Sequence, residues 1–204
     1  FLINTRDLGA AQAVEFFKGF RSKNLSLPFS GADIPIITPS DALEGAPIAV
    51  NNYEKAALGY LALKELMGDQ LFKQALHEYM ARWNGKHPIP WDMFNTFNDA
   101  TGQNYNWFFN NWFFGANYLD IAIGDIQKTA SGYTVQVKNV GGKAIPFDLQ
   151  VVSTDALTTT LHQSPAVWQN SPDLITVTIT STQAVKSITA DGGIFMDATP
   201  GNNT

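Results

Sequence analysis

The segment Asn51-Asn52-Tyr53-Glu54-Lys55 places a phenolic hydroxyl where a helix is predicted to begin. Asn51 or Asn52 can N-cap this helix, because an asparagine side chain accepts a hydrogen bond from the free N–H groups of a first turn. The phenol then stands at the mouth of a helix whose later residues are mostly apolar. On these residues alone, a tyrosine at a helix start more often packs than takes part in catalysis.

The segment His77-Glu78-Tyr79-Met80-Ala81 is close to a zinc-binding motif but lacks its second ligand. A His-Glu-x-x-His helix places two imidazoles one turn apart on the same face, with the glutamate aimed at a metal-bound water. Here the last position is Ala81, and His87 lies beyond Gly85 in the following turn. We therefore expect no local metal site, and His77 is interpreted as an exposed or half-buried helix residue.

The remaining reactive side chains form no familiar catalytic motif. His162 is alone on a predicted strand, with no acidic or nucleophilic motif nearby, and is interpreted as structural. The sequence has no Gly-x-Ser-x-Gly elbow, no phosphate-binding glycine loop and no acidic loop with calcium spacing. The absence of cysteine excludes disulfides, thiolate nucleophiles and cysteine-ligated zinc, and it leaves the compartment open.

Charge and hydropathy limit the partners that we expect. The net charge is −5 and the 13 basic residues are spread thinly, so nucleic acid is not an expected partner. No apolar run approaches the roughly 20 residues that cross a bilayer, so we expect no transmembrane segment. The chain starts without a methionine or leader and is interpreted as part of a longer protein. Its low charge and many Asn and Thr residues favour a bacterial periplasmic, envelope-associated or secreted location.

The spacing of apolar residues along the sequence changes once, near Tyr118. Before it, apolar residues recur at helical spacing, whereas after it β-branched residues alternate with polar ones between Gly, Asn and Pro. We therefore predict an α+β fold of two domains, with a helical domain over residues 1–117 and a β-sandwich over residues 118–204.

The helical domain is predicted to open with a helix over Ala10 to Arg21, whose apolar stripe is Ala13, Phe16, Phe17 and Phe20. An irregular segment from Leu25 to Pro47 follows, with a short turn at Ser40 to Glu44. Gly68 can end the helix that begins near Asn51, and Asp69 can cap the next.

Because these two helices are joined so tightly, they are expected to form an antiparallel hairpin. The second of them should align Phe72, Leu76, Tyr79, Met80 and Trp83 on one face. Two further helices are predicted over Trp91 to Thr101, closed by Gly102, and over Tyr105 to Phe114, capped by Asn104. The large rings of the last helix are expected to be core: Trp107, Phe108, Trp112 and Phe113.

Seven short strands are predicted after Tyr118, and together they suggest an immunoglobulin-like β-sandwich without a catalytic constellation. They cover Leu119 to Ile123, Tyr133 to Asn139, Pro146 to Ser153, Leu157 to His162, Leu174 to Thr180, Val185 to Thr189 and Ile194 to Met196.

Several short motifs, taken in order, resemble the aminopeptidase N-type gluzincin metallopeptidases. They are Tyr53-Glu54-Lys55, Asp69-Gln70-Leu71-Phe72, Asp92-Met93-Phe94 and Trp107-Phe108-Phe109-x-x-Trp112-Phe113. Each is weak alone, but their order and spacing make the match more specific. The likeness runs from about Leu43 to the end of the chain. One departure is Ala56, where the family commonly carries glycine.

This resemblance implies the C-terminal part of a thermolysin-like catalytic domain followed by the sandwich domain. It implies zinc in the full-length protein, held by upstream helices that are absent here, so that no zinc is expected in these residues. Tyr53 falls on the catalytic tyrosine, whose hydroxyl donates a hydrogen bond to the oxyanion formed when zinc-bound water attacks a peptide carbonyl. The implied activity is an aminopeptidase acting on peptides, with the 204 residues alone inactive.

A second hypothesis remains open, in which the chain is a non-catalytic module. The aromatic-rich helices and the sandwich would then serve as a scaffold or bind a peptide or glycan. The presence or absence of a His-Glu-x-x-His motif upstream of Phe1 would discriminate the two.

Overall fold

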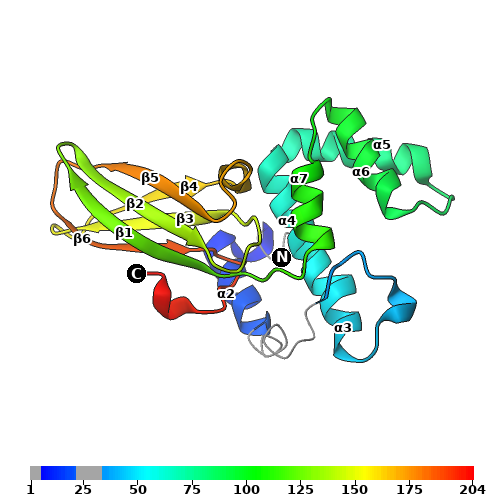
Figure 1. Ribbon diagram of the computed structural model, residues 1–204, viewed down its shortest axis with the longest axis horizontal. Coiled ribbons are helices and arrows are strands. Elements are labelled where there is room, and N and C mark those ends of the chain that lie inside the picture. Colours follow the sequence, from blue (N-terminus) through cyan, green and yellow to red (C-terminus); the bar gives the residue numbers. More distant parts are fainter. Residues whose placement is uncertain (1–5, 22–33) are drawn as a thin grey trace.

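The computed structural model describes residues 6–21 and 34–204, and its helices and sheets lie in separate parts of the molecule (Figure 1). The described α-helices and π-helical segments precede Gly115, and every long strand of the described chain follows Asp120, where only two short 3-10 helices, Pro165–Trp168 and Pro200–Asn202, accompany the strands. The fold is therefore mixed α+β, as predicted. The division at residue 118 stays a prediction, because the buried residues of both parts belong to one contiguous hydrophobic cluster.

Helix α2 spans Ala10–Arg21, as predicted. Its apolar stripe is only partly in contact with the rest of the protein. Ala13 is fully buried and Phe17 packs against the core, whereas Phe16 is exposed. Within the segment predicted to be irregular, Leu25 to Pro47, residues 25–33 lie outside the described residues, and the expected turn is present as a short 3-10 helix, Ser40–Ala42.

A single continuous helical stretch runs through α3 (Ala46–Ala49), a π-helical segment (Val50–Lys55, η3) and α4 (Ala56–Met67). The residues at both junctions keep right-handed helical dihedrals. The stretch begins after Gly45, which has a φ of 65° and whose carbonyl accepts a hydrogen bond from Ile48. The predicted N-cap at Asn51 or Asn52 is therefore wrong, and Tyr53 lies inside this stretch rather than at its mouth.

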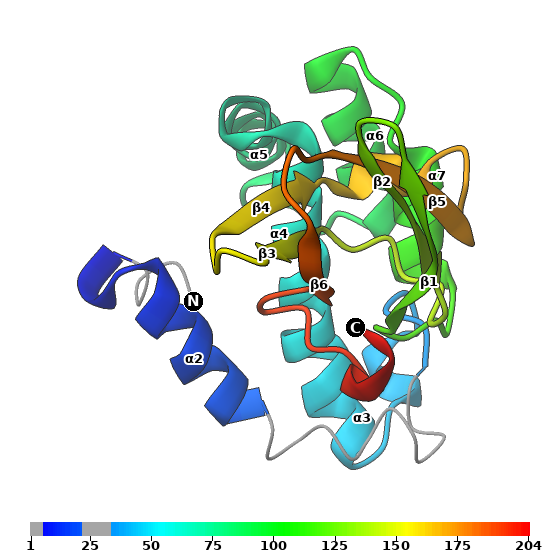
Figure 2. The same cartoon turned by 90° about the vertical axis from the view of Figure 1, so that its left-hand side faces the viewer.

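Gly68, with a φ of 79°, ends α4 and turns the chain directly into α5 (Asp69–Trp83). Helix α5 runs across the end of α4 in Figure 1 and is seen end-on beside it in Figure 2. The predicted antiparallel hairpin is wrong because one residue cannot reverse the chain, which takes a loop of about two to five residues. Asp69 is not a cap either, since its carboxylate pairs with Lys64 and Lys73 at 3.0 and 2.6 Å.

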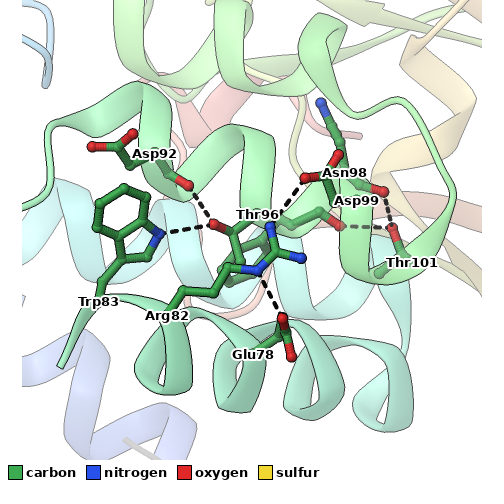
Figure 3. A network of polar contacts seen from close by, with 9 residues as sticks. Glu78, Arg82, Trp83, Asp92, Thr96, Asn98, Asp99 and Thr101 are labelled. Atoms are coloured by element: carbon green, nitrogen blue, oxygen red, sulfur yellow. Dashed lines mark hydrogen bonds and ion pairs between the residues drawn. The ribbon is translucent and has the colours of Figure 1, made fainter.

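Helix α5 instead packs along α6 (Pro90–Thr101), and polar side chains join the two (Figure 3). Arg82 bridges Glu78 on its own helix at 2.7 Å and Asp99 on α6 at 3.0 Å. Between the same two helices, Trp83 Nε1 donates to the buried Thr96 Oγ1 at 3.1 Å. The ion pairs are exposed at the surface, whereas the hydrogen bond from Trp83 satisfies the buried hydroxyl of Thr96.

The aromatic helix consists of α7 (Asn106–Phe109) and a second π-helical segment (Asn110–Phe114, η4). Three of the four rings predicted to be core are buried, namely Phe108, Trp112 and Phe113. The fourth, Trp107, is only half-buried. The indole of Trp112 lies so close to α4 that a Cβ at Gly59 would stand 3.2 Å from it. Glycine at position 59 therefore sets the separation of these two helices.

Two three-stranded antiparallel sheets make up the second part of the fold. One has the order β1 (Ile121–Thr129), β2 (Gly132–Asn139), β5 (Leu174–Thr180), and the other the order β4 (Thr158–Gln163), β3 (Phe147–Ser153), β6 (Val185–Asp191). Figure 2 shows the sheets facing each other. Alternate apolar residues of both sheets, Val135, Val137, Leu149 and Val151 among them, fill the shared core. Six of the seven predicted strands are therefore confirmed.

The seventh predicted strand, Ile194 to Met196, is wrong. Asp191 Oδ1 accepts a hydrogen bond from Gly193 N at 2.8 Å, and Phe195 N donates to Gly192 O at 2.9 Å, so the chain turns there. Ile194 and Phe195 are nevertheless buried, because the turn directs them into the core. Apolar residues after two glycines thus supplied core contacts without pairing as a strand.

Lys143 joins the aromatic helix to the sheets. Its side chain is buried, and its ammonium donates to the carbonyl oxygens of Asn111, Trp112 and Gly115 at 2.9, 2.9 and 3.1 Å. These carbonyls lie at the C-terminal end of the helix, where unpaired acceptors and the helix dipole favour a cation. The Asn111 side chain adds a second link by accepting a hydrogen bond from Ala144 N at 2.8 Å.

His162 makes a further link between helices and sheets, which corrects the expectation that it has no acidic neighbour. Its ring nitrogens lie 2.7 Å from Asp148 Oδ1 on β3 and 2.9 Å from Glu65 Oε1 on α4. Partial burial by itself lowers the pKa of His162, but the hydrogen bonds and charges of Asp148 and Glu65 outweigh it, so the pKa is raised. An imidazolium can donate to both carboxylates at once.

None of the helices formed by residues 6–21 and 34–204 is both long and apolar enough to span a membrane.

Replacing Lys143 with Met should lower the free energy of unfolding by about 3 kcal/mol, because buried carbonyl oxygens then lose their donor. Urea denaturation of the 204-residue chain measures this change. The exposed Lys128 on β1 offers the matched control, and Lys128→Met should stay within about 0.5 kcal/mol of the unmodified chain. Equal stability of the two variants would contradict the role of Lys143.

The link through His162 should stabilise the fold at acidic but not at alkaline pH. Because the folded-state pKa is raised above the unfolded value of about 6.5, the stabilisation is complete below that value and is lost as the pH rises through the folded pKa. The melting temperature of the unmodified chain should exceed that of His162→Gln most at about pH 5.5, and the difference should shrink by about pH 8.5. His77→Gln serves as the control, and a difference that does not vary with pH would refute the link.

Candidate functional site

Tyr53 projects from the π-helical segment Val50–Lys55 and is 71% exposed. It is not among the buried residues of the described core, so packing does not account for it. A π-helical turn admits one extra residue per turn and shifts the direction of the side chains that it carries. The phenol is therefore an accessible hydrogen-bond donor presented from the middle of a long, continuous helix.

Two buried polar residues of this segment bind backbone carbonyl oxygens of a preceding part of the chain. Lys55 is 8% exposed, and its Nζ donates to the carbonyl oxygen of Ile34 at 2.7 Å. Asn51 is fully buried, and its Nδ2 lies 3.5 Å from the carbonyl oxygen of Pro35. Both side chains therefore tie the helical segment to the backbone of Ile34 and Pro35.

A pocket of about 380 Å³ lies beside the segment and includes Asn52 in its wall. The remaining walls come from the loop 36–40, the turn 88–90, helices α4 to α6 and Phe113 of the aromatic helix, and they are mainly apolar. The hydroxyl of Tyr60 reaches Met93 Sδ at 3.0 Å, and burial together with Tyr79 raises the pKa of Tyr60. Burial and the nearby Asp92 raise the pKa of Tyr79 as well. Both phenols therefore stay protonated at neutral pH.

A second pocket, of about 400 Å³, lies where the aromatic helix meets the sheets. Several amide side chains line it, and two of them, Asn111 and Asn139, make structural hydrogen bonds. Asn111 binds the backbone of Gly142 and Ala144, and Asn139 accepts a hydrogen bond from Gly142 N and donates to the carbonyl oxygen of Pro172. These amides therefore order the junction between helices and sheets.

The described residues do not bring a metal site together. Glu78, the acidic residue of the incomplete zinc motif, is paired with Arg82 at 2.7 Å, and His77 has no metal-binding partner there. Across residues 6–21 and 34–204, no three His, Asp or Glu side chains are placed to hold a metal ion. Zinc thus has no fitting set of ligands within this part of the chain.

Sequence reasoning identified Tyr53 but did not identify Asn51 as a residue that holds it. Asn51 and Lys55 flank Tyr53 at two residues on either side and are four residues apart. Residues at that spacing lie on one face of a helix. The available signal was thus a polar pair on the face opposite an exposed tyrosine, and we interpreted Asn51 as a cap instead.

No protein-family model matches this chain, and no curated protein sequence matches it. Its structure is similar to that of Legionella pneumophila aminopeptidase A, crystallised in complex with aspartic acid. The TM-score is 0.51 at 14% sequence identity, over 83% of this chain and 20% of the Legionella chain. The chain thus spans one fifth of the length of that protein. A likeness at this identity shows a shared fold.

Tyr53→Ala should leave the stability of the 204-residue chain within about 0.5 kcal/mol, because an exposed side chain contributes little to packing. The matched variant is Tyr105→Ala, which removes an 8% exposed ring and should cost about 3 kcal/mol or more. Chemical denaturation measures both. A large loss for Tyr53→Ala would show that the ring packs against the protein after all.

Proposed function

We propose that this chain is the C-terminal portion of a zinc-dependent aminopeptidase of the aminopeptidase N type, with Tyr53 as its oxyanion donor. The observation that carries the proposal is the exposed hydroxyl of Tyr53 on a helical segment pinned by buried polar residues. The motif order around Tyr53-Glu54-Lys55 and the fold shared with an aminopeptidase support it. The proposal also treats residues 1–117 as the end of a thermolysin-like domain and residues 118–204 as an immunoglobulin-like sandwich.

In this proposal Tyr53 acts on the scissile carbonyl of a peptide bond. Its hydroxyl donates a hydrogen bond to the oxygen on which negative charge develops, and such a donor stabilises a transition state most when it is fixed in place beforehand. Zinc, which would activate the attacking water, has no set of ligands among the described residues. The proposal therefore assigns the metal ligands and the general base to another part of the full-length protein.

Replacing Tyr53 with Phe in the full-length protein should lower kcat about 100- to 1000-fold, the range found for other oxyanion donors. Zinc content and folding should not change, because the hydroxyl is exposed and binds no metal. The control is Tyr133→Phe on β2, whose hydroxyl accepts a hydrogen bond from Val185 N at 3.4 Å. Turnover of Tyr53→Phe equal to that of the control would overturn the proposed role.

The 204 residues alone should hydrolyse no aminoacyl anilide and retain no stoichiometric zinc after dialysis. The reason is that the donor by itself cannot activate water. Metal analysis and an anilide assay with and without a chelator test this expectation. Chelator-sensitive hydrolysis by the purified chain would mean that it contains a complete active site.

A further inference from the structure

The π-helical geometry of Val50–Lys55 is confined to one part of a stretch that is otherwise α-helical from Ala46 to Met67. Helices rarely contain such turns, and those that do often have them at functional sites. A local π-turn persists only where side chains stabilise it against the regular α-helix. Two buried side chains of this segment, Asn51 and Lys55, meet that requirement.

Lys55 provides the stronger contact. Burying an ammonium group is unfavourable unless it is hydrogen-bonded, and Lys55 is 8% exposed with its Nζ 2.7 Å from the Ile34 carbonyl oxygen. The acceptor lies 21 residues away in sequence, so the bond fixes the π-turn to a separate stretch of backbone. The bond therefore opposes rotation of the turn about the helix axis.

Asn51 fixes the other end of the turn. It is fully buried, its Nδ2 lies 3.5 Å from the Pro35 carbonyl oxygen, and its Oδ1 has no hydrogen-bond partner. A buried amide with an unpaired oxygen is unfavourable, so burial of this side chain does not by itself explain the residue. The acceptors of Asn51 and Lys55 are adjacent residues, so one piece of backbone holds both sides of the turn.

We propose that Asn51 and Lys55 are positioning residues for Tyr53. They attach the π-turn to the backbone of Ile34 and Pro35, and so fix the direction in which the Tyr53 hydroxyl points. This inference rests on the proposed function, because it assigns the two residues to the oxyanion donor. They act through Tyr53 and do not contact the reacting atoms themselves.

The full-length protein tests the proposal through kcat. Lys55→Met and Asn51→Leu should each lower kcat about 10- to 100-fold with little change in KM, because a displacement of the donor by about 1 Å can cost that much. Lys55→Arg should recover part of the activity, since it keeps a donor of similar reach. The control is Lys73→Met on α5, whose ammonium pairs with Asp69 at the surface.

A double variant separates positioning from a general loss of structure. If Lys55 acts through Tyr53, then Tyr53→Phe combined with Lys55→Met should be no slower than Tyr53→Phe alone. Additive losses would overturn the proposal. If Tyr53→Phe abolishes turnover while Lys55→Met and Asn51→Leu do not lower it, the positioning role fails and the proposed function stands. If Tyr53→Phe has no effect, the proposed function fails.

Hydrogen exchange on the 204-residue chain gives a readout that does not depend on activity. Lys55→Met should raise the exchange rates of the amides in Val50–Lys55 about tenfold or more, while those of α5 stay unchanged. This pattern distinguishes local release of the turn from global unfolding, which would raise the rates of both segments. Unchanged exchange in Val50–Lys55 would overturn the proposal even if the full-length variant lost activity.

Discussion

The buried ammonium of Lys143 holds the two parts of this protein together. It satisfies three carbonyl oxygens at the end of the aromatic helix, from Asn111, Trp112 and Gly115, and lies 5.5 Å from the centre of the Trp112 ring. Those carbonyls would otherwise face the core without donors. Trp112 also packs against Gly59 of α4. Lys143 therefore links the position of α4 to that of the sheets through Trp112.

The long helix from Ala46 to Met67 is consequently fixed at several points along its length. Trp112 contacts it at Gly59, His162 reaches it at Glu65, and the backbone of Ile34 and Pro35 holds its π-helical turn. Aromatic packing, an ion pair and buried hydrogen bonds thus contribute at different positions. Tyr53 is exposed on a helical turn whose buried residues, Asn51 and Lys55, are hydrogen-bonded to that backbone.

The regular elements were predictable, because their causes are local. Alternation of Val135 and Val137 with polar residues identified β2, and Gly68 and Gly102 mark the ends of α4 and α6. The hydrogen-bond partners that support the candidate site were not predictable, because they are distant in sequence. His162 meets an acidic residue 97 positions away, and no local pattern distinguishes a π-turn from an α-helical one.

The uninterrupted helix from Ala46 to Met67 connects two sites that are otherwise separate, the phenol of Tyr53 and the contact between Glu65 and His162. Tyr53 and Glu65 are 12 residues apart on the same helical stretch, which corresponds to about 18 Å along its axis. The edge strand β4, through His162, and the π-turn that carries Tyr53 are therefore two sites on one continuous helix, so the second sheet is connected to the phenol without touching it.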